Sequence, residues 1–198
     1  MEGKGASRRR GEALEQAILD AAFEEFRASG YAGFTMEGVA KRAGTSKPVV
    51  YRRWSSRVEI LIACVANRLP PVETVPDTGA LRTDLVEVLT LAYGRMKMIG
   101  QTAMLGMLTD VSADPDARER LLISLVKELT NLLDRSVYDR AIARGELAEE
   151  HLTPRLRRLP IDLARNEFII FGPIAVEAIG GIVEEVVLPA LRARGARV

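Results

Sequence analysis

The segment from Thr35 to Tyr51 constrains the fold more than any other part of this 198-residue chain. It contains two short stretches with helical character, and Gly44 supplies a tight turn between them. A small residue, Ala40, stands where the second helix must approach the first. The second stretch, at about 47–53, exposes polar and basic groups. This order of short helix, tight turn and short polar helix is typical of a helix-turn-helix.

Capping and helix-breaking residues set the expected limits of the helices around this motif. Thr35 and Ser46 are expected to cap the two short helices, because a hydroxyl can accept a hydrogen bond from a free amide of the first turn. Pro48 falls within the first turn of the second helix, where a missing amide costs little. The helix before the motif is expected to end at Gly30.

The rest of the chain also predicts helices and no β-hairpin. After a fourth helix at 56–69 and a linker, we expect helices at about 80–99, 101–111, 115–144, 156–171 and 176–194. Pro189 should kink or end the last of these. The fold class is therefore all-α, with an N-terminal three-helix helix-turn-helix domain joined to a C-terminal helical domain. The expected limits are a disordered basic arm at 1–10, the helix-turn-helix domain at 11–55, a connecting helix and linker at 56–77, and the C-terminal domain at 78–198.

Positive charge is concentrated in and just after the motif. Six basic residues and no acidic residue lie between Lys41 and Arg57. Such a patch can neutralise the phosphates of DNA, although a solvated basic face would have the same composition. A second cluster, Arg8-Arg9-Arg10, is either an arm that lies near the minor groove or a solubilising tail.

The sequence lacks the residue constellations of an enzyme. His151 is the only histidine and Cys64 the only cysteine, so no zinc site of the usual kind, no other metal site and no cofactor are expected. Phosphate-binding and nucleophile motifs are also missing. No apolar run approaches the roughly 18 residues of a membrane helix, and a lone cysteine fits a reducing compartment. We therefore expect a cytoplasmic protein without a membrane partner.

Residues from about 12 to 65 resemble the N-terminal signature of the tetracycline-repressor (TetR) family. The residues that carry the resemblance are Gly30-Tyr31, Phe34-Thr35-Met36, Val39-Ala40, the run from Ala43 to Trp54, Arg57 and Leu61. Pro48, Trp54 and Arg57 stand where the family usually has Gly or Ala, Phe, and Lys. Beyond residue 65 only the length and the order of helices agree.

The resemblance implies a homodimeric repressor that binds double-stranded DNA at a palindromic operator and is released by a small-molecule effector. It places three residues at the base-facing start of the recognition helix, namely Lys47, Pro48 and Val49. It places five others against the DNA backbone: Thr35, Ser46, Tyr51, Arg53 and Arg57. Lys47 is suited to donate to guanine O6 or N7. Tyr51 could instead be a core aromatic residue, and Trp54 is expected in the core.

Two apolar patterns in the C-terminal domain predict an effector pocket and a dimer interface. The uncharged, Met-rich stretch 98–109 suits an adaptable apolar cavity, and the predicted lining is Tyr93, Met96, Met104, Met107, Leu108 and Phe168. The resemblance implies that the last two helices form the dimer interface. A wide apolar stripe on the last helix fits this role, and the predicted interface residues are Phe171 on the preceding helix and Ile179, Ile182, Val183, Val186 and Val187 on the last one. Either set could instead belong to the ordinary core of the chain.

Two other functions remain open from the sequence. The chain could be a DNA-binding regulator that needs no effector. It could also be a helical small-molecule-binding protein that does not bind DNA and whose basic stretch is incidental. Binding to a palindrome would exclude the second function, and a co-purified ligand would exclude the first.

Overall fold

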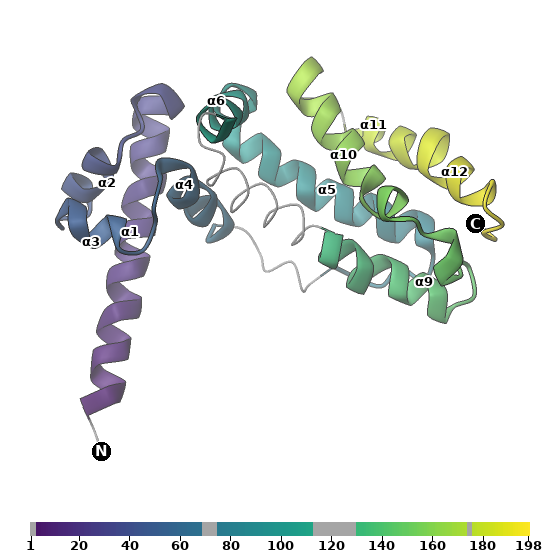
Figure 1. Ribbon diagram of the computed structural model, residues 1–198, viewed down its shortest axis with the longest axis horizontal. Helices are drawn as coiled ribbons and strands as arrows, with labels where there is room; N and C mark the ends of the chain where they lie inside the picture. Colours follow the sequence, from purple (N-terminus) through teal and green to yellow (C-terminus); the bar gives the residue numbers. More distant parts are fainter. Residues whose placement is uncertain (1–2, 69–74, 113–129, 174–175) are drawn as a thin grey trace. The chain divides into compact units, whose positions relative to one another are not determined.

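The computed structural model describes residues 3–68, 75–112, 130–173 and 176–198, which form helices and turns without a strand (Figure 1). The all-helical prediction is confirmed. None of the helices in these ranges is long and apolar enough to cross a membrane. Most of the predicted linker and the start of the helix expected at residue 115 lie outside the described residues.

The chain divides into two compact units, which are described separately. The N-terminal unit contains Met1–Leu69 together with Leu105–Ala113, and the C-terminal unit contains Pro70–Met104 together with Asp114–Val198. The predicted domain limits assigned everything after residue 78 to the C-terminal domain. The division by contacts differs from them, because the segment after Met104 packs within the N-terminal unit.

Four helices from the start of the chain build most of the N-terminal unit. They are α1 (Gly3–Gly33), α2 (Met36–Arg42), α3 (Lys47–Tyr51) and α4 (Arg57–Ala66). The structure draws the backbone of residues 3–10 as helical, and the disordered arm expected at 1–10 stays a prediction. The backbone departs from helical geometry at Gly30, where the sequence predicted the end of the first helix.

Local hydrogen bonds explain where the short helices begin. Thr35 Oγ1 accepts from the amide of Gly38 at 3.0 Å, so the predicted cap of α2 is confirmed. Ser46 occupies the capping position of α3 with extended backbone, but its side chain makes no capping hydrogen bond. Gly44 has φ +63° in the turn between α2 and α3, a left-handed conformation that glycine adopts without steric cost.

Aromatic and aliphatic side chains form the core of the N-terminal unit. Phe26 and Phe34 meet edge to face with ring centroids 6.1 Å apart. Trp54 is buried, as predicted, and so is Val50 on α3. Because Val50 faces inward, the opposite side of α3 faces solvent.

The C-terminal unit is built around α5 (Leu81–Ile99), and α10 (Pro154–Phe171) packs against it. Among the described residues, α9 (Asp139–Ala143), α11 (Val176–Gly181) and α12 (Leu188–Arg192) also belong to this unit, and α6 (Gln101–Ser112) begins in it but belongs to the N-terminal unit from Leu105 onward. The limits of α5, α6 and α10 lie within two residues of the predicted ones. Figure 1 shows α10 beside the run from α11 to α12, drawn in green and yellow.

The last helical run continues through Pro189 because a wider turn precedes the proline. Residues Ile182–Val187 form a π-helical turn between α11 and α12, and the amide of Leu188 donates to the carbonyl of Val183. Pro189 then lies in the first turn of α12, where its missing amide is tolerated. Where a kink was expected, the helix instead changes locally from α-helical to π-helical hydrogen bonding, and the helical run extends to Arg192.

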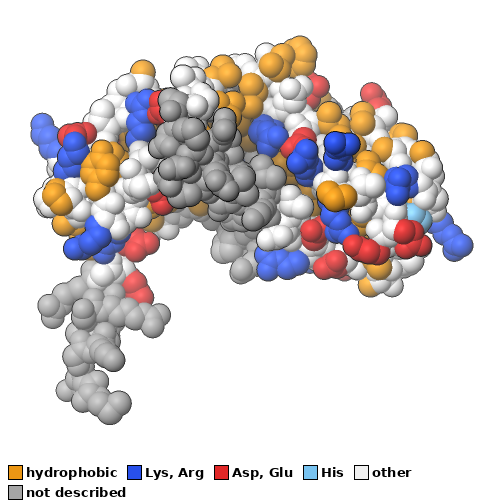
Figure 2. All heavy atoms as spheres, viewed as in Figure 1, with side chains coloured by type: hydrophobic (Ala, Val, Ile, Leu, Met, Phe, Trp, Pro, Cys, Tyr) orange, Lys and Arg blue, Asp and Glu red, His pale blue; other side chains and the backbone are white. Residues whose placement is uncertain are grey.

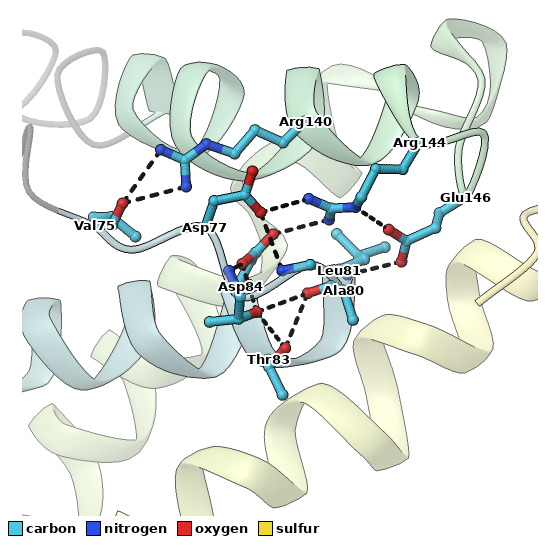
Figure 3. A network of polar contacts seen from close by, with 11 residues as sticks. Val75, Asp77, Ala80, Leu81, Thr83, Asp84, Arg140, Arg144 and Glu146 are labelled. Atoms are coloured by element: carbon cyan, nitrogen blue, oxygen red, sulfur yellow. Dashed lines mark hydrogen bonds and ion pairs between the residues drawn. The ribbon is translucent and has the colours of Figure 1, made fainter.

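A buried carboxylate anchors the start of α5 (Figure 3). Asp84 has no exposed surface, and its Oδ2 accepts from Arg144 Nη2 at 2.9 Å. Its Oδ1 accepts from the amide and the hydroxyl of Thr78 at 2.8 and 2.7 Å. Burial acts to raise the pKa of Asp84, but the hydrogen bonds from Thr78 and Arg144 outweigh it and hold this pKa below its ordinary value.

Arg144 also connects this carboxylate to two neighbouring ones. Its Nη1 donates to Asp77 Oδ1 at 2.9 Å, and its Nε donates to Glu146 Oε1 at 2.5 Å. Glu146 Oε2 in turn accepts from the amide of Leu81, the first residue of α5, at 2.7 Å. One guanidinium after α9 therefore holds both the chain entering α5 and the first turn of that helix (Figure 3).

Candidate functional site

The two short helices of the motif present the predicted base-facing residues to solvent. α2 packs against α3, and Lys47 and Pro48 at the start of α3 are exposed while Val49 is half-buried. The buried Val50 fixes this orientation from the other side of the helix. An exposed helix start of this kind has the size and polarity to enter the major groove of B-DNA, which is about 12 Å wide.

Lys47 is held by two neighbours in the free protein. Its ammonium group forms an ion pair with Glu37 on α2 and lies 5.4 Å from the centroid of the Tyr51 ring. The hydrogen bond between Lys47 and Glu37 raises the pKa of Lys47 and lowers the pKa of Glu37. The Tyr51 side chain is 42% exposed, so the alternative of a core aromatic residue is wrong.

The residues predicted to contact phosphates fall into two groups. Thr35, Ser46 and Tyr51 are exposed. Arg53 is only 21% exposed, and its Nε lies 3.9 Å from Glu15 Oε2. Its Nη1 is buried and has no hydrogen-bond partner in the described part of the chain. Arg57 is also engaged within the unit, by a carboxylate from α6.

Asp110 on α6 binds Arg57 through two hydrogen bonds. Arg57 Nε and Nη2 donate to Asp110 Oδ2 and Oδ1 at 2.6 and 2.9 Å. The Tyr31 hydroxyl donates to Asp110 Oδ2 at 2.6 Å, and the Arg57 guanidinium lies 4.6 Å from the centroid of the Tyr31 ring. The hydrogen bond from Arg57 is the main cause that lowers the pKa of Asp110, and burial together with Asp110 raises the pKa of Tyr31.

Sequence reasoning missed Glu37 and Asp110 as members of this site. Both are isolated carboxylates: Glu37 is the only acidic residue between Glu25 and Glu59, and Asp110 ends the uncharged stretch 98–109. This isolation was the available signal. Figure 2 shows Lys and Arg side chains on the N-terminal unit, at the left, with acidic side chains among them.

The residues predicted to line an effector pocket do not all belong to the same unit. Tyr93, Met96 and Phe168 are buried in the core of the C-terminal unit, and Met104 is partly buried against it. Tyr93 and Phe168 meet edge to face with ring centroids 5.5 Å apart. Met107 and Leu108 belong to the N-terminal unit, and Leu108 is exposed.

The predicted dimer interface is exposed at two of its six residues. Phe171 is 70% and Val186 42% exposed, and Ile170, which the sequence analysis did not single out, is 60% exposed. The structure corrects the prediction for the other four, which lie in the core of their own unit: Ile179, Ile182, Val183 and Val187. Ile182, Val183 and Val187 belong to the π-helical turn, which packs against α5 and α10, and Ile179 belongs to α11, which packs against α5.

Two family models match the chain. The model described as bacterial regulatory proteins, tetR family, matches residues 18–64, and the model described as tetracyclin repressor-like, C-terminal domain, matches residues 75–186. Together they match parts of both units, and the first contains α2, α3 and most of α4.

Curated relatives are similar over most of the chain. A DNA-binding transcriptional repressor TetR of Mycobacteroides abscessus is 28% identical over 184 residues, covering 92% of this chain and 96% of that protein. An HTH-type transcriptional regulator of Mycobacterium tuberculosis is 29% identical over 180 residues, covering 89% of this chain and 87% of that protein.

Solved structures share the fold. A TetR transcriptional regulator from Rhodococcus sp. RHA1 matches with a TM-score of 0.58 at 20% identity, covering 93% of this chain and 98% of that one. A tetR-family transcriptional regulator from Streptomyces coelicolor matches with a TM-score of 0.57 at 17% identity, covering 92% and 88% of the two chains. At these identities the likeness shows the fold alone.

Proposed function

Because the chain belongs to the tetR family of bacterial regulatory proteins, we propose that it represses transcription as a homodimer on a palindromic operator. DNA-binding transcriptional regulation is the activity of its family and relatives. The observation that carries the proposal is the outward-facing start of α3. It presents Lys47 and Pro48 to solvent, with exposed hydroxyl side chains beside them. A repressor of this kind acts where the chromosome is, in the cytoplasm.

In the proposed complex, Lys47, Pro48 and Val49 read base edges. Lys47 leaves Glu37 and donates to guanine, while the apolar surfaces of Pro48 and Val49 suit a thymine methyl group. The exposed hydroxyls of Thr35, Ser46 and Tyr51 donate to phosphates. For Arg53 and Arg57 this role stays a prediction, and their contacts with Glu15 and Asp110 count against it.

The selection of bound duplexes from a random library tests the DNA-binding proposal. The wild-type protein should recover a palindrome, since a two-fold dimer places one recognition helix on each half-site. Lys47→Ala should relax base preference at one position of each half-site and cost roughly 1–3 kcal/mol on the selected duplex. Lys97→Ala, at an exposed position of α5, is the matched control and should leave selection unchanged. Equal effects of Lys47→Ala on selected and random DNA would contradict base reading.

We also propose release of the operator by a small, mostly apolar effector bound in the C-terminal unit. Support comes from the aromatic pair Tyr93 and Phe168, with Met96 beside them in the same core. Met104 is only partly buried at the edge of that core, and its flexible thioether side chain can rearrange around a ligand. A DNA-binding regulator without an effector is the alternative.

Replacement of Met104 tests the effector proposal. Uncharged aromatic compounds would be screened for release of the selected duplex, followed by fluorescence anisotropy. We expect Met104→Ala to change the concentration of an active compound needed for release by about tenfold or more. The substitution removes several methylene-sized groups from the wall of the proposed site. DNA binding without the compound should stay the same. Leu91→Ala, at an exposed position of α5 outside the predicted pocket, is the control, and the absence of any releasing compound would favour the effector-independent alternative.

A further inference from the structure

The basic segment of the N-terminal unit is largely neutralised by carboxylates. Four of the six basic residues between Lys41 and Arg57 form ion pairs in the described structure. The carboxylates for Arg42, Lys47 and Arg53 come from α1 and α2, within the first 37 residues. The carboxylate for Arg57 is Asp110, which lies within the residues matched by the C-terminal family model.

The contact between α6 and α1 is closely fitted around Tyr31. A Cβ atom at Gly106 would lie 2.4 Å from Cδ1 of the Tyr31 ring, so the ring rests directly on the backbone of α6. Gly106 and Asp110 are four residues apart and therefore share one face of the helix. The ring contacts the first position, and its hydroxyl donates to the carboxylate at the second. Two separate contacts thus place Asp110 at Arg57.

The pair between Asp110 and Arg57 is accessible to competition. The side chains of Arg57 and Asp110 are 33% and 31% exposed, so another anion can approach the guanidinium. The same two nitrogens that bind the carboxylate form the fork that Arg offers to a phosphate. Asp110 and a DNA phosphate would therefore compete for the same donors.

We propose that Asp110 withholds Arg57 from DNA and so limits the number of phosphates that the N-terminal unit neutralises. This inference rests on the proposed function as a DNA-binding regulator. Arg57 opens α4, three residues after the buried Trp54, and is the last basic residue of the basic segment. A carboxylate fixed on it removes one positive charge from that segment in each chain of the dimer.

The experiment measures affinity for the selected duplex as a function of salt concentration. Asp110→Asn keeps the shape of the side chain and removes its charge, so Arg57 becomes free to bind a phosphate. The affinity at low salt should rise roughly three- to tenfold for two chains. The slope of log affinity against log salt should steepen by about 0.9 per chain, since each additional phosphate contact releases a counterion.

Three matched variants separate this effect from general changes in charge or stability. Glu87→Gln makes the same charge change at an exposed position of α5 and should leave the slope unchanged. Tyr31→Phe removes the hydroxyl that donates a hydrogen bond to Asp110 but leaves the ion pair between Asp110 and Arg57 in place. The slope of log affinity against log salt should therefore again be unchanged. Asp110→Asn added to Arg57→Gln should not steepen the slope, because the arginine that would bind the phosphate is gone.

The outcomes that overturn the proposal are distinct from a failure of the proposed function. If wild-type protein selects no duplex, the function fails before any variant is compared. If it binds a palindrome but Asp110→Asn leaves the slope unchanged or weakens binding, the inference is wrong. Arg57→Gln alone gives a second test that does not depend on the folding of Asp110→Asn. A slope flattened by about 0.9 per chain in that variant means that Arg57 already binds phosphate and overturns the inference.

Discussion

Arg144→Ala should lower the free energy of unfolding by about 3–5 kcal/mol, because it leaves the buried carboxylate of Asp84 without its cation. The variant loses the contacts from Arg144 to Asp77, Asp84 and Glu146 at once. Thr78 still donates to Asp84, but a neutral hydroxyl and an amide cannot balance a buried charge. Urea denaturation followed by circular dichroism measures the difference.

A surface arginine provides the control for this change. Arg82 on α5 forms an ion pair with Glu184, and both side chains are well exposed. Arg82→Ala should therefore cost less than about 1 kcal/mol. A double variant, Asp84→Asn with Arg144→Leu, removes both charges and should recover part of the lost stability. Equal losses for Arg144→Ala and Arg82→Ala would contradict the anchoring role of the buried carboxylate.

Val183→Glu should prevent folding and Val186→Glu should prevent only assembly, although the two residues are three positions apart. Val183 is buried in the core of its own unit, so a carboxylate there costs several kcal/mol and should unfold the C-terminal unit. Val186 is 42% exposed and is proposed to contact the second chain. Its glutamate variant should stay folded, become a monomer and lose most of its affinity for the palindrome.

Sedimentation equilibrium and thermal denaturation distinguish these outcomes. The wild-type protein should sediment at about twice the mass of one chain, as the symmetric dimers of this kind do. Val186→Ser serves as the neutral control and should remain dimeric. A folded dimer of Val186→Glu would contradict the interface, and a folded Val183→Glu would contradict the burial seen in the structure.

Helix limits were predictable because their signals are local. Gly30, Gly44 and Gly100 interrupt helices at the positions where the sequence predicted ends, and the Thr35 hydroxyl caps the helix that follows it. Such signals act within one turn of helix, so a reading of neighbouring residues is sufficient. The role proposed for the start of α3 came from the family resemblance and not from a local signal; the structure adds that Val50 is the buried residue of that short helix.

Long-range partners were not predictable in this way. The stripe with Val183 and Val187 was assigned to the dimer, because periodicity shows that a helix face is apolar but not what covers it. Asp110 binds Arg57 across 53 positions of sequence, and no periodic pattern connects them. The π-helical turn at 182–187 likewise depends on packing around Pro189 and left no signature in the order of apolar residues.

The close fit of α6 around Tyr31 bears on how such proteins can be recombined. A chimera joined at the linker would keep Tyr31 and Arg57 but receive the sixth helix of another regulator. That helix would need a residue without a side chain and, four positions later, a carboxylate, as Gly106 and Asp110 provide here. Donor domains can therefore be chosen by these two positions, and a graft that instead moves the junction beyond residue 112 carries the native pair along.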